Sequence, residues 1–331
     1  MTTAPEKLPT LRGSVPPVRE WARTVAIGIC MGSADAVPGV SGGTIALIAG
    51  IYGRLIAMIT AITPERVRAL LLALTPLDGG FDFRRALSIF DEVDGWFGLA
   101  LVGGVGFAVV LVTRAVHWFS INYPVVLFGF FFGLIGASAV VLLRELTWES
   151  GFQVLAGVTG FAIAFLLSGP KTLLSGGGLP VVFVAGAIAV SAMILPGISG
   201  SLLLVILGQY IRMTETLSRF VDGLIGAVTG GPTDQLVSDG LVVVTFILGG
   251  LVGVFTIGRV VRRALDRNRR ATIAVLVALV VGALRAPVVE VQDEPGFSPE
   301  VLAVFAGVAV FGAAFLLVLD WYAVDLDLDS V

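Results

Sequence analysis

Long apolar blocks dominate this sequence and limit what the chain can fold into. They recur along nearly the whole chain, and many are roughly 20 residues long, the length of helix that spans a hydrocarbon core of about 30 Å. Only 14% of the residues are charged, compared with about 25% in soluble globular proteins. Because lipid offers no hydrogen bonds, a spanning backbone must pair its own polar groups, and a helix does so. The sequence therefore predicts an all-α integral membrane protein.

The apolar segments alternate with short polar connections. They cover residues 21–37, 41–62, 96–116, 123–143, 152–167, 179–195, 199–220, 241–258, 271–284 with an extension to 291, and 301–319. Residues 63–94 are mixed and predict an interfacial segment or loop, and residues 222–240 predict a Gly-rich polar connection. Residues 1–20 are polar and Pro-rich and predict a disordered tail. Residues 322–331 predict an acidic tail at the other end.

One motif occurs twice in the chain, at a constant offset of 158 residues. Ser33–Gly42 aligns with Ser191–Gly200 in this way. The match continues without a gap from Gly50, Tyr52 and Arg54 to Gly208, Tyr210 and Arg212. Each motif is followed by three predicted spans, so the chain consists of two copies of one repeat unit. We expect a single membrane domain with a first repeat over 21–168 and a second over 169–321.

The number of crossings in each repeat fixes their relative orientation. Each repeat is predicted to hold a broken or re-entrant helical hairpin plus about three transmembrane helices, an odd number of crossings whether the hairpin is re-entrant or fully spanning. The second copy is then inverted, as in many secondary transporters. With the N-terminus in the cytoplasm, 16 of the 21 Lys and Arg residues lie inside, as the positive-inside rule requires. The other five are Arg114, Lys171, Arg212, Arg219 and Arg285. The sequence thus predicts a multi-pass protein of the cell membrane with a cytoplasmic N-terminus.

The two motifs predict helix breaks inside the membrane. Pro-Gly pairs at Pro38-Gly39 and Pro196-Gly197 interrupt apolar segments, and such breaks persist in lipid only when they pack in protein or face a polar cavity. The helices that restart beyond them present free N–H groups, and helix N-termini bind anions, phosphate above all. The predicted phosphate-binding residues are Ser41, Gly42, Gly43, Thr44, Ser199, Gly200 and Ser201. The alternative is that these residues are helix caps with glycines that ease close packing.

Asp35 is the ionisable residue that stands out near the first break. It lies in an apolar run three residues before Pro38, and its counterpart in the second repeat is Met193. An acid inside the membrane is a functional candidate by default. Two roles remain open for it: carrying a proton that lets an anion cross, or capping N–H groups freed at the break. Tyr52 and Tyr210, by contrast, are predicted to lie in the interfacial aromatic belt.

The doubled motif resembles a known family. Pro38-Gly39-Val40-Ser41-Gly42-Gly43-Thr44 and Pro196-Gly197-Ile198-Ser199-Gly200-Ser201 look like the paired signatures of the polyprenyl-phosphate transporter family, formerly a membrane family of unknown function. The likeness covers residues 21–320. It implies a transporter that moves a polyprenyl-phosphate lipid carrier across the membrane for recycling. The carrier would be undecaprenyl phosphate, or dolichyl phosphate in an archaeal member.

Two other functions are alternatives to transport of this lipid. Membrane polyprenyl-pyrophosphate phosphatases continue a similar loop with arginine, but Gly42 and Gly200 stand in that place here. Without that charge the transition state loses its main clamp, so we predict no catalytic residues. An ion-coupled carrier of a small soluble anion stays open. A single cysteine excludes disulfides and cysteine metal sites. We predict no metal, cofactor or nucleic-acid partner, and the oligomeric state is left unassigned.

Overall fold

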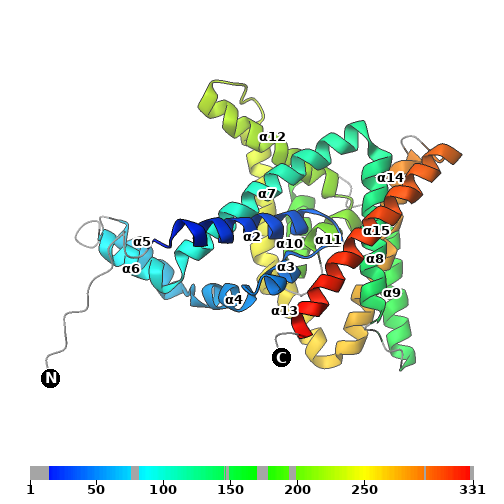
Figure 1. The fold of residues 1–331 in the computed structure, drawn as a ribbon, viewed down its shortest axis with the longest axis horizontal. Helices are drawn as coiled ribbons and strands as arrows, with labels where there is room; N and C mark the ends of the chain where they lie inside the picture. The colour runs from blue at the N-terminus through cyan, green and yellow to red at the C-terminus, as the bar shows by residue number, and fades with distance from the viewer. Residues whose placement is uncertain are drawn as a thin grey trace. The chain divides into compact units, whose positions relative to one another are not determined.

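The computed structural model of this chain shows an arrangement of helices (Figure 1). It describes residues 15–75, 82–144, 146, 149–169, 178–193, 199–293 and 296–328. Within these ranges, four helical stretches are long and apolar enough to cross a membrane: Gly95–Asn122, Pro124–Arg144, Leu236–Asp293 and Pro299–Tyr322. A pair of shorter helices, bent by 116°, adds up to one more. The prediction of an all-α membrane protein is confirmed.

The first of two compact units contains residues 15–32 and 45–108. Its elements are the start of α2 (Val18–Ala36), most of α3 (Gly42–Ile48), α4 (Tyr52–Ala61), α5 (Pro64–Ala73), α6 (Phe83–Glu92) and the start of α7 (Gly95–Asn122). The predicted interfacial segment at 63–94 holds two short helices. Thr63 caps α5 by accepting the N–H of Arg66, and Asp82 caps α6 by accepting that of Arg85.

Small residues hold α2 and α7 together within this unit. A side chain at Gly28 or Gly104 would overlap a backbone carbonyl of the facing helix, which is the close packing that membrane helices achieve with glycine. Arg54, at the start of α4, pairs with Glu20 at 3.0 Å and with Asp94 at 2.5 Å. This ion network connects α4 to α2 and to the residue that precedes α7.

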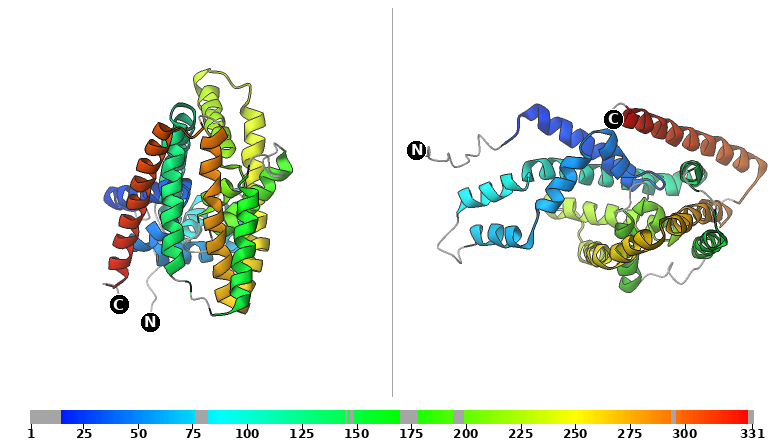
Figure 2. Two further views of the ribbon diagram at one scale, coloured as in Figure 1. Left: turned by 90° about the vertical axis from the view of Figure 1, so that its right-hand side faces the viewer. Right: turned by 90° about the horizontal axis from the view of Figure 1, so that it is seen from below.

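The second unit contains the described residues within 33–44 and 109–331. Its further elements are α8 (Pro124–Arg144), α9 (Gly151–Leu167), α10 (Leu179–Ala192), α11 (Gly200–Ile206), α12 (Tyr210–Thr229), α13 (Leu236–Ala283), α14 (Arg285–Asp293) and α15 (Pro299–Leu328). α8 packs along α15, and α13 packs against both α9 and α10 (Figure 2). The core between them is apolar and centred on Phe131, Leu134 and Ile135 of α8.

Glycine also brings backbones together in this unit. A Cβ atom on Gly249 or Gly253 of α13 would overlap the carbonyl oxygen of Phe183 or Ala187 in α10. On the other side of the core, a Cβ atom on Gly133 of α8 would overlap the carbonyl of Ala309 in α15. Within each of these two pairs, α10 with α13 and α8 with α15, the helix backbones are therefore in direct contact.

Four of the predicted segments were wrong in detail. The segment 41–62 is not one helix but the bent pair α3 and α4, and 199–220 is likewise divided into α11 and the beginning of α12. Residues 222–240 are mostly helical, because α12 continues to Thr229 and α13 begins at Leu236. The helix of α13 also runs through the predicted connection 259–270 as far as Asn268. There the backbone leaves the helical region, and the Asn268 side chain caps the next turn by accepting the N–H of Ala271 at 3.1 Å.

Candidate functional site

The first break lies between α2 and α3 and is buried in protein. α2 ends at Ala36 and α3 begins at Gly42. Pro38 between them is fully buried, and Gly39 has a φ of +92°, a conformation that favours glycine. A side chain at Gly39 would come within 3.3 Å of the α8 backbone at Leu134 and Ile135. The sequence Pro-Gly is thus needed both to stop α2 and to let the chain lie against α8.

Asp35 holds the N-terminus of α3. Its Oδ1 accepts the backbone N–H of Gly42 at 2.8 Å, and a Cβ atom on Gly42 would overlap this carboxylate. A negative charge at this end of a helix is favoured by the helix dipole. Of the N–H groups predicted to be free, that of Gly42 is therefore taken by Asp35, and that of Thr44 donates to the carbonyl of Ser41 at 3.1 Å. The capping role is the one that the contacts display, and the proton-carrying role stays a prediction.

The second motif is capped by hydroxyl groups instead. Ser199 accepts the N–H of Leu202 at 3.5 Å, and its hydroxyl lies 2.7 Å from that of Ser201. Both serines are buried. Met193 occupies the place of Asp35, and its side chain lies near Gly200 as Asp35 lies near Gly42. The predicted breakpoint Pro196-Gly197 lies outside the described residues.

The two copies of the motif also share a second break, which the sequence did not predict. Gly50 and Gly208 have φ angles of +68° and +64° and end the short helices α3 and α11. The next residues, Ile51 and Gln209, have nearly the same backbone angles, with φ of −104° and −106° and ψ of −3° and −7°. Each then leads into a helix that begins at a tyrosine. The repeat is therefore present in the local backbone, while the inverted orientation of its copies stays a prediction.

Tyr210 joins the two motifs, although the sequence placed it in an interfacial belt. It is 4% exposed, and its hydroxyl donates to the carbonyl oxygen of Ala36 at 2.6 Å. Its ring packs edge-on against Phe131, with 5.5 Å between the centroids. Val37 and Val40 of the first motif contact the same apolar cluster that contains Leu202 of the second. No signal in the sequence distinguishes the buried Tyr210 from its half-buried counterpart in the first repeat.

A row of charges on α12 faces α7 and α13. Arg114 of α7 pairs with Asp222, and Arg219 pairs with the buried Asp239 of α13 at 3.2 Å. His117 Nδ1 lies 3.7 Å from a carboxylate oxygen of Glu215. The acidic and basic side chains of α12 thus have oppositely charged partners on α7 and α13, at Arg114 and Asp239. Glu215 belongs to another helix, so no local sequence pattern places it next to His117.

Comparison with known proteins places the chain in a family. The model of the undecaprenyl phosphate translocase-like family matches residues 31–294, which include both motifs. A polyprenyl-phosphate transporter of Vibrio cholerae serotype O1 is 32% identical over 264 residues, which cover 80% of this chain and 76% of that protein. A polyprenyl-phosphate transporter of Staphylococcus aureus is 27% identical over 303 residues, covering 88% of this chain and 92% of that protein. No solved structure matches.

These matches confirm the resemblance that the doubled motif predicted. They extend over both repeats, including the connection between them. The chain is therefore a multi-pass helical membrane protein that belongs to the undecaprenyl phosphate translocase-like family.

Proposed function

We propose that this protein moves polyprenyl phosphate across the cell membrane and holds the phosphate at the N-termini of α3 and α11. Its relatives in two bacteria carry the name polyprenyl-phosphate transporter. A lipid of this kind needs protein donors only for its phosphate, because the isoprenoid chain can remain in the bilayer. The predicted donors are the backbone and hydroxyl groups of Ser41–Thr44 and Ser199–Ser201.

The hydrogen bond from Gly42 to Asp35 is the observation that carries this proposal. It puts a carboxyl oxygen on a helix N-terminus among apolar segments, which is the kind of contact that a phosphate oxygen would make. An arriving phosphate would have to displace the Asp35 carboxylate, since two anions at one N-terminus repel each other. Protonation of Asp35 removes that repulsion. A proton would then cross together with the lipid phosphate.

The second motif offers a complementary set of donors. The hydroxyl groups of Ser199 and Ser201 lie within hydrogen-bond distance of each other and are buried. Each can rotate to donate to a phosphate oxygen. No carboxylate stands in this motif, because Met193 replaces the acid of the first repeat. In the inverted arrangement that we infer from the odd number of crossings, the two N-termini would approach one phosphate from opposite sides.

We further infer that the N-terminus is cytoplasmic and that the lipid moves from the outer to the inner leaflet. The excess of arginine in the predicted inside segments supports this orientation. A carrier lipid released outside the cell must return to the inner leaflet before it can be reused. Transport in this direction would complete that cycle without any covalent step.

The test is transport by the purified full-length protein in proteoliposomes that contain headgroup-labelled polyprenyl phosphate. We expect the wild-type protein to move this lipid between leaflets and to leave inorganic phosphate outside the vesicles. Replacing both hydroxyls, as Ser199→Ala with Ser201→Ala, should slow transport roughly tenfold or more, because hydrogen bonds to a charged group contribute about 1.5–3 kcal/mol each. Thr245→Ala is the matched control, since this exposed hydroxyl only bonds its own helix.

Three results would contradict the proposed function. The first is a wild-type protein that leaves the lipid in its original leaflet. The second is uptake of inorganic phosphate at the same rate, which would favour a carrier of small anions. The third is release of phosphate from polyprenyl pyrophosphate by the wild type but not by the double serine variant, which would make the protein an enzyme.

A further inference from the structure

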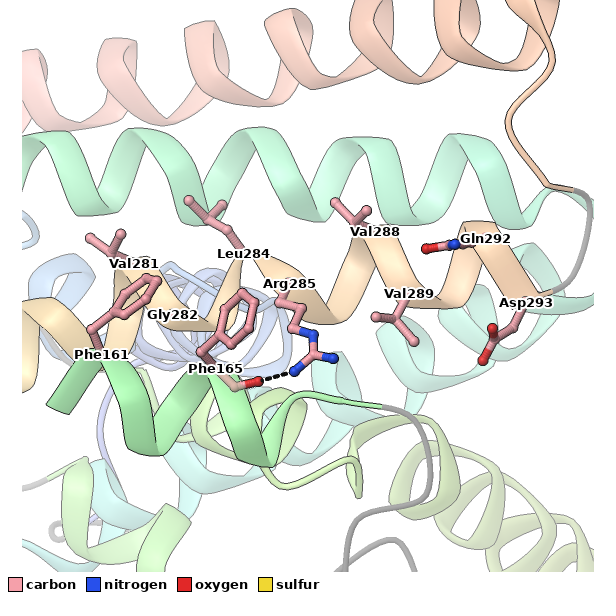
Figure 3. A pocket seen from close by; sticks show the side chains of 10 residues that line it. All are labelled: Phe161, Phe165, Val281, Gly282, Leu284, Arg285, Val288, Val289, Gln292 and Asp293. Carbon is pink, nitrogen blue, oxygen red and sulfur yellow. Dashed lines mark hydrogen bonds between the residues drawn. The ribbon is translucent and has the colours of Figure 1, made fainter. Parts of the chain in front are cut away.

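A groove on the second unit contains an arginine among apolar side chains. It lies between the end of α9 and the stretch where α13 meets α14, and its volume is about 630 Å³ (Figure 3). Its lining residues are Phe161, Phe165, Val281, Gly282, Leu284, Arg285, Val288, Val289, Gln292 and Asp293. Typical ligand sites have volumes of about 300–1,000 Å³. Neither motif contributes to this groove.

Arg285 is fixed against α9 by two contacts. One guanidinium nitrogen, Nη1, donates to the backbone carbonyl of Phe165 at 2.6 Å, and the guanidinium carbon lies 4.3 Å from the centre of the Phe165 ring. Figure 3 shows the side chain crossing from its own helix to α9. Among the described residues, no carboxylate lies within ion-pair distance of this guanidinium. The carbonyl takes one of the five N–H donors that a guanidinium carries.

The walls of the groove suit an apolar chain. Phe161 and Phe165 are 40% and 41% exposed, and the valines at 288 and 289 are half-buried. Asp293 is the acid of the groove and lies eight residues beyond Arg285, about 12 Å along a helix. An anionic group beside Arg285 is therefore separated from the groove's own negative charge. A fixed cation next to an exposed apolar surface is complementary to a lipid with one phosphate and a long hydrocarbon chain.

We propose that this groove is an entry site for the transported lipid, with the phosphate on Arg285 and the first isoprene units along Phe161 and Val281. This inference rests on the proposed function and adds a second binding site to it. In the predicted topology the span 271–291 ends outside the cell, so Arg285 lies at the depth of the outer leaflet. The lipid would be captured there and passed to the donors of the two motifs.

A purely structural role for Arg285 makes different predictions. The Phe165 carbonyl belongs to the last turn of α9, and an arginine that bonds such a carbonyl caps the helix. Arg285→Gln keeps a donor for this carbonyl and removes the charge. A cap would therefore be largely preserved in this variant, whereas a phosphate site would be lost. Val289→Trp fills the groove next to Arg285 and leaves the arginine in place.

The experiment uses the full-length protein in nanodiscs and an undecaprenyl phosphate analogue with a photoreactive group on its isoprenoid chain. The readout is labelling of the peptide 281–293. Arg285→Gln should reduce this labelling about tenfold to a hundredfold, because charge-assisted hydrogen bonds to phosphate are lost. Val289→Trp should reduce it as well. Arg259→Gln is the matched control, since Arg259 also lies over a phenylalanine ring, that of Phe255, but outside the groove.

Transport supplies the second readout. Arg285→Gln should raise the KM for undecaprenyl phosphate about tenfold or more while changing kcat much less, because the arginine acts before the crossing step. Unchanged labelling of 281–293 in Arg285→Gln, or competition by phosphatidylglycerol as strong as by unlabelled undecaprenyl phosphate, would overturn the entry site alone. A wild-type protein that neither binds nor moves the lipid would overturn the proposed function, and this inference with it.

Discussion

Removing the hydroxyl of Tyr210 tests whether the second repeat supports the break in the first. Tyr210→Phe keeps the ring against Phe131 and deletes only the donor to the Ala36 carbonyl, so no cavity opens. A buried acceptor left without its donor costs about 1–3 kcal/mol. Because this hydrogen bond is only partly buried, we expect a loss of about 1–2 kcal/mol in the free energy of unfolding.

The control is the same substitution at the matching position of the first repeat. Tyr52 is half-buried, and within the described part of the chain no hydrogen bond from its hydroxyl is found. Tyr52→Phe should therefore change the free energy of unfolding by less than about 0.5 kcal/mol. The measurement is reversible unfolding in mixed micelles of a denaturing detergent, followed by tryptophan fluorescence. Equal values for the two variants would refute the bond from Tyr210 to Ala36 as a support of the break.

The same two variants can also be compared in the transport assay. If the break must hold its shape for the phosphate to reach α3, Tyr210→Phe should slow transport of polyprenyl phosphate more than Tyr52→Phe does. Transport at the wild-type rate in a destabilised Tyr210→Phe variant would separate the stability of the break from its function.

Three further predictions concern the motifs and the topology. Gly200→Ala should destabilise the protein by about 1–3 kcal/mol through overpacking, and more than Gly42→Ala does. The Cβ atom at position 200 would lie 2.8 Å from a rigid backbone carbonyl, whereas that at position 42 would meet a movable carboxylate. Denaturant midpoints that rank the two variants the other way would contradict this. Asp35→Asn should make transport independent of pH, and a retained pH profile would leave Asp35 as a cap. Cysteines at positions 265 and 295 should be labelled from the cytoplasm and the outside respectively; labelling of both from one side would exclude the inverted repeat.

The long apolar helices could be predicted from the sequence because their signal is simple. α8, α9 and α10 each begin within a residue or two of the predicted position. Hydrophobic length alone decides such elements, since lipid penalises any other backbone. The helix α2 ends at Ala36, two residues before the Pro-Gly pair at Pro38, and proline does not continue a helix.

The elements that were missed depend on contacts between distant residues. Gly50 and Gly208 lie in apolar runs, where glycine is common in membrane helices, so nothing local marked them as breaks. The charges in the continuation of α12 have partners on another helix, such as Arg114 for Asp222. A hydrophobicity profile treats such charges as the end of a span, because it cannot register that each is neutralised by a neighbour.

The residue types of the candidate site could be predicted from the sequence, but the contacts between them could not. The alternation of glycine and hydroxyl residues after each Pro-Gly pair suggested helix N-termini, and the capping role of Asp35 was one of the two alternatives that the sequence left open. The role of Tyr210 depends on its hydroxyl reaching a carbonyl 174 residues away. Arg285 was recognised only as one of five basic residues outside the cytoplasmic segments. Its surroundings come from α9, which the local sequence cannot reveal.

The backbone contacts made by glycine have a mechanical consequence. Where Gly249 and Gly253 meet the carbonyls of α10, a shift of α13 by one residue would drive larger side chains into that backbone. Protein interiors at such density transmit displacement instead of absorbing it. Each pair of helices held together by glycine contacts, α10 with α13 and α8 with α15, should therefore move as one rigid body. A conformational change of the protein should then move each pair as a whole, with bending confined to residues outside these glycine contacts.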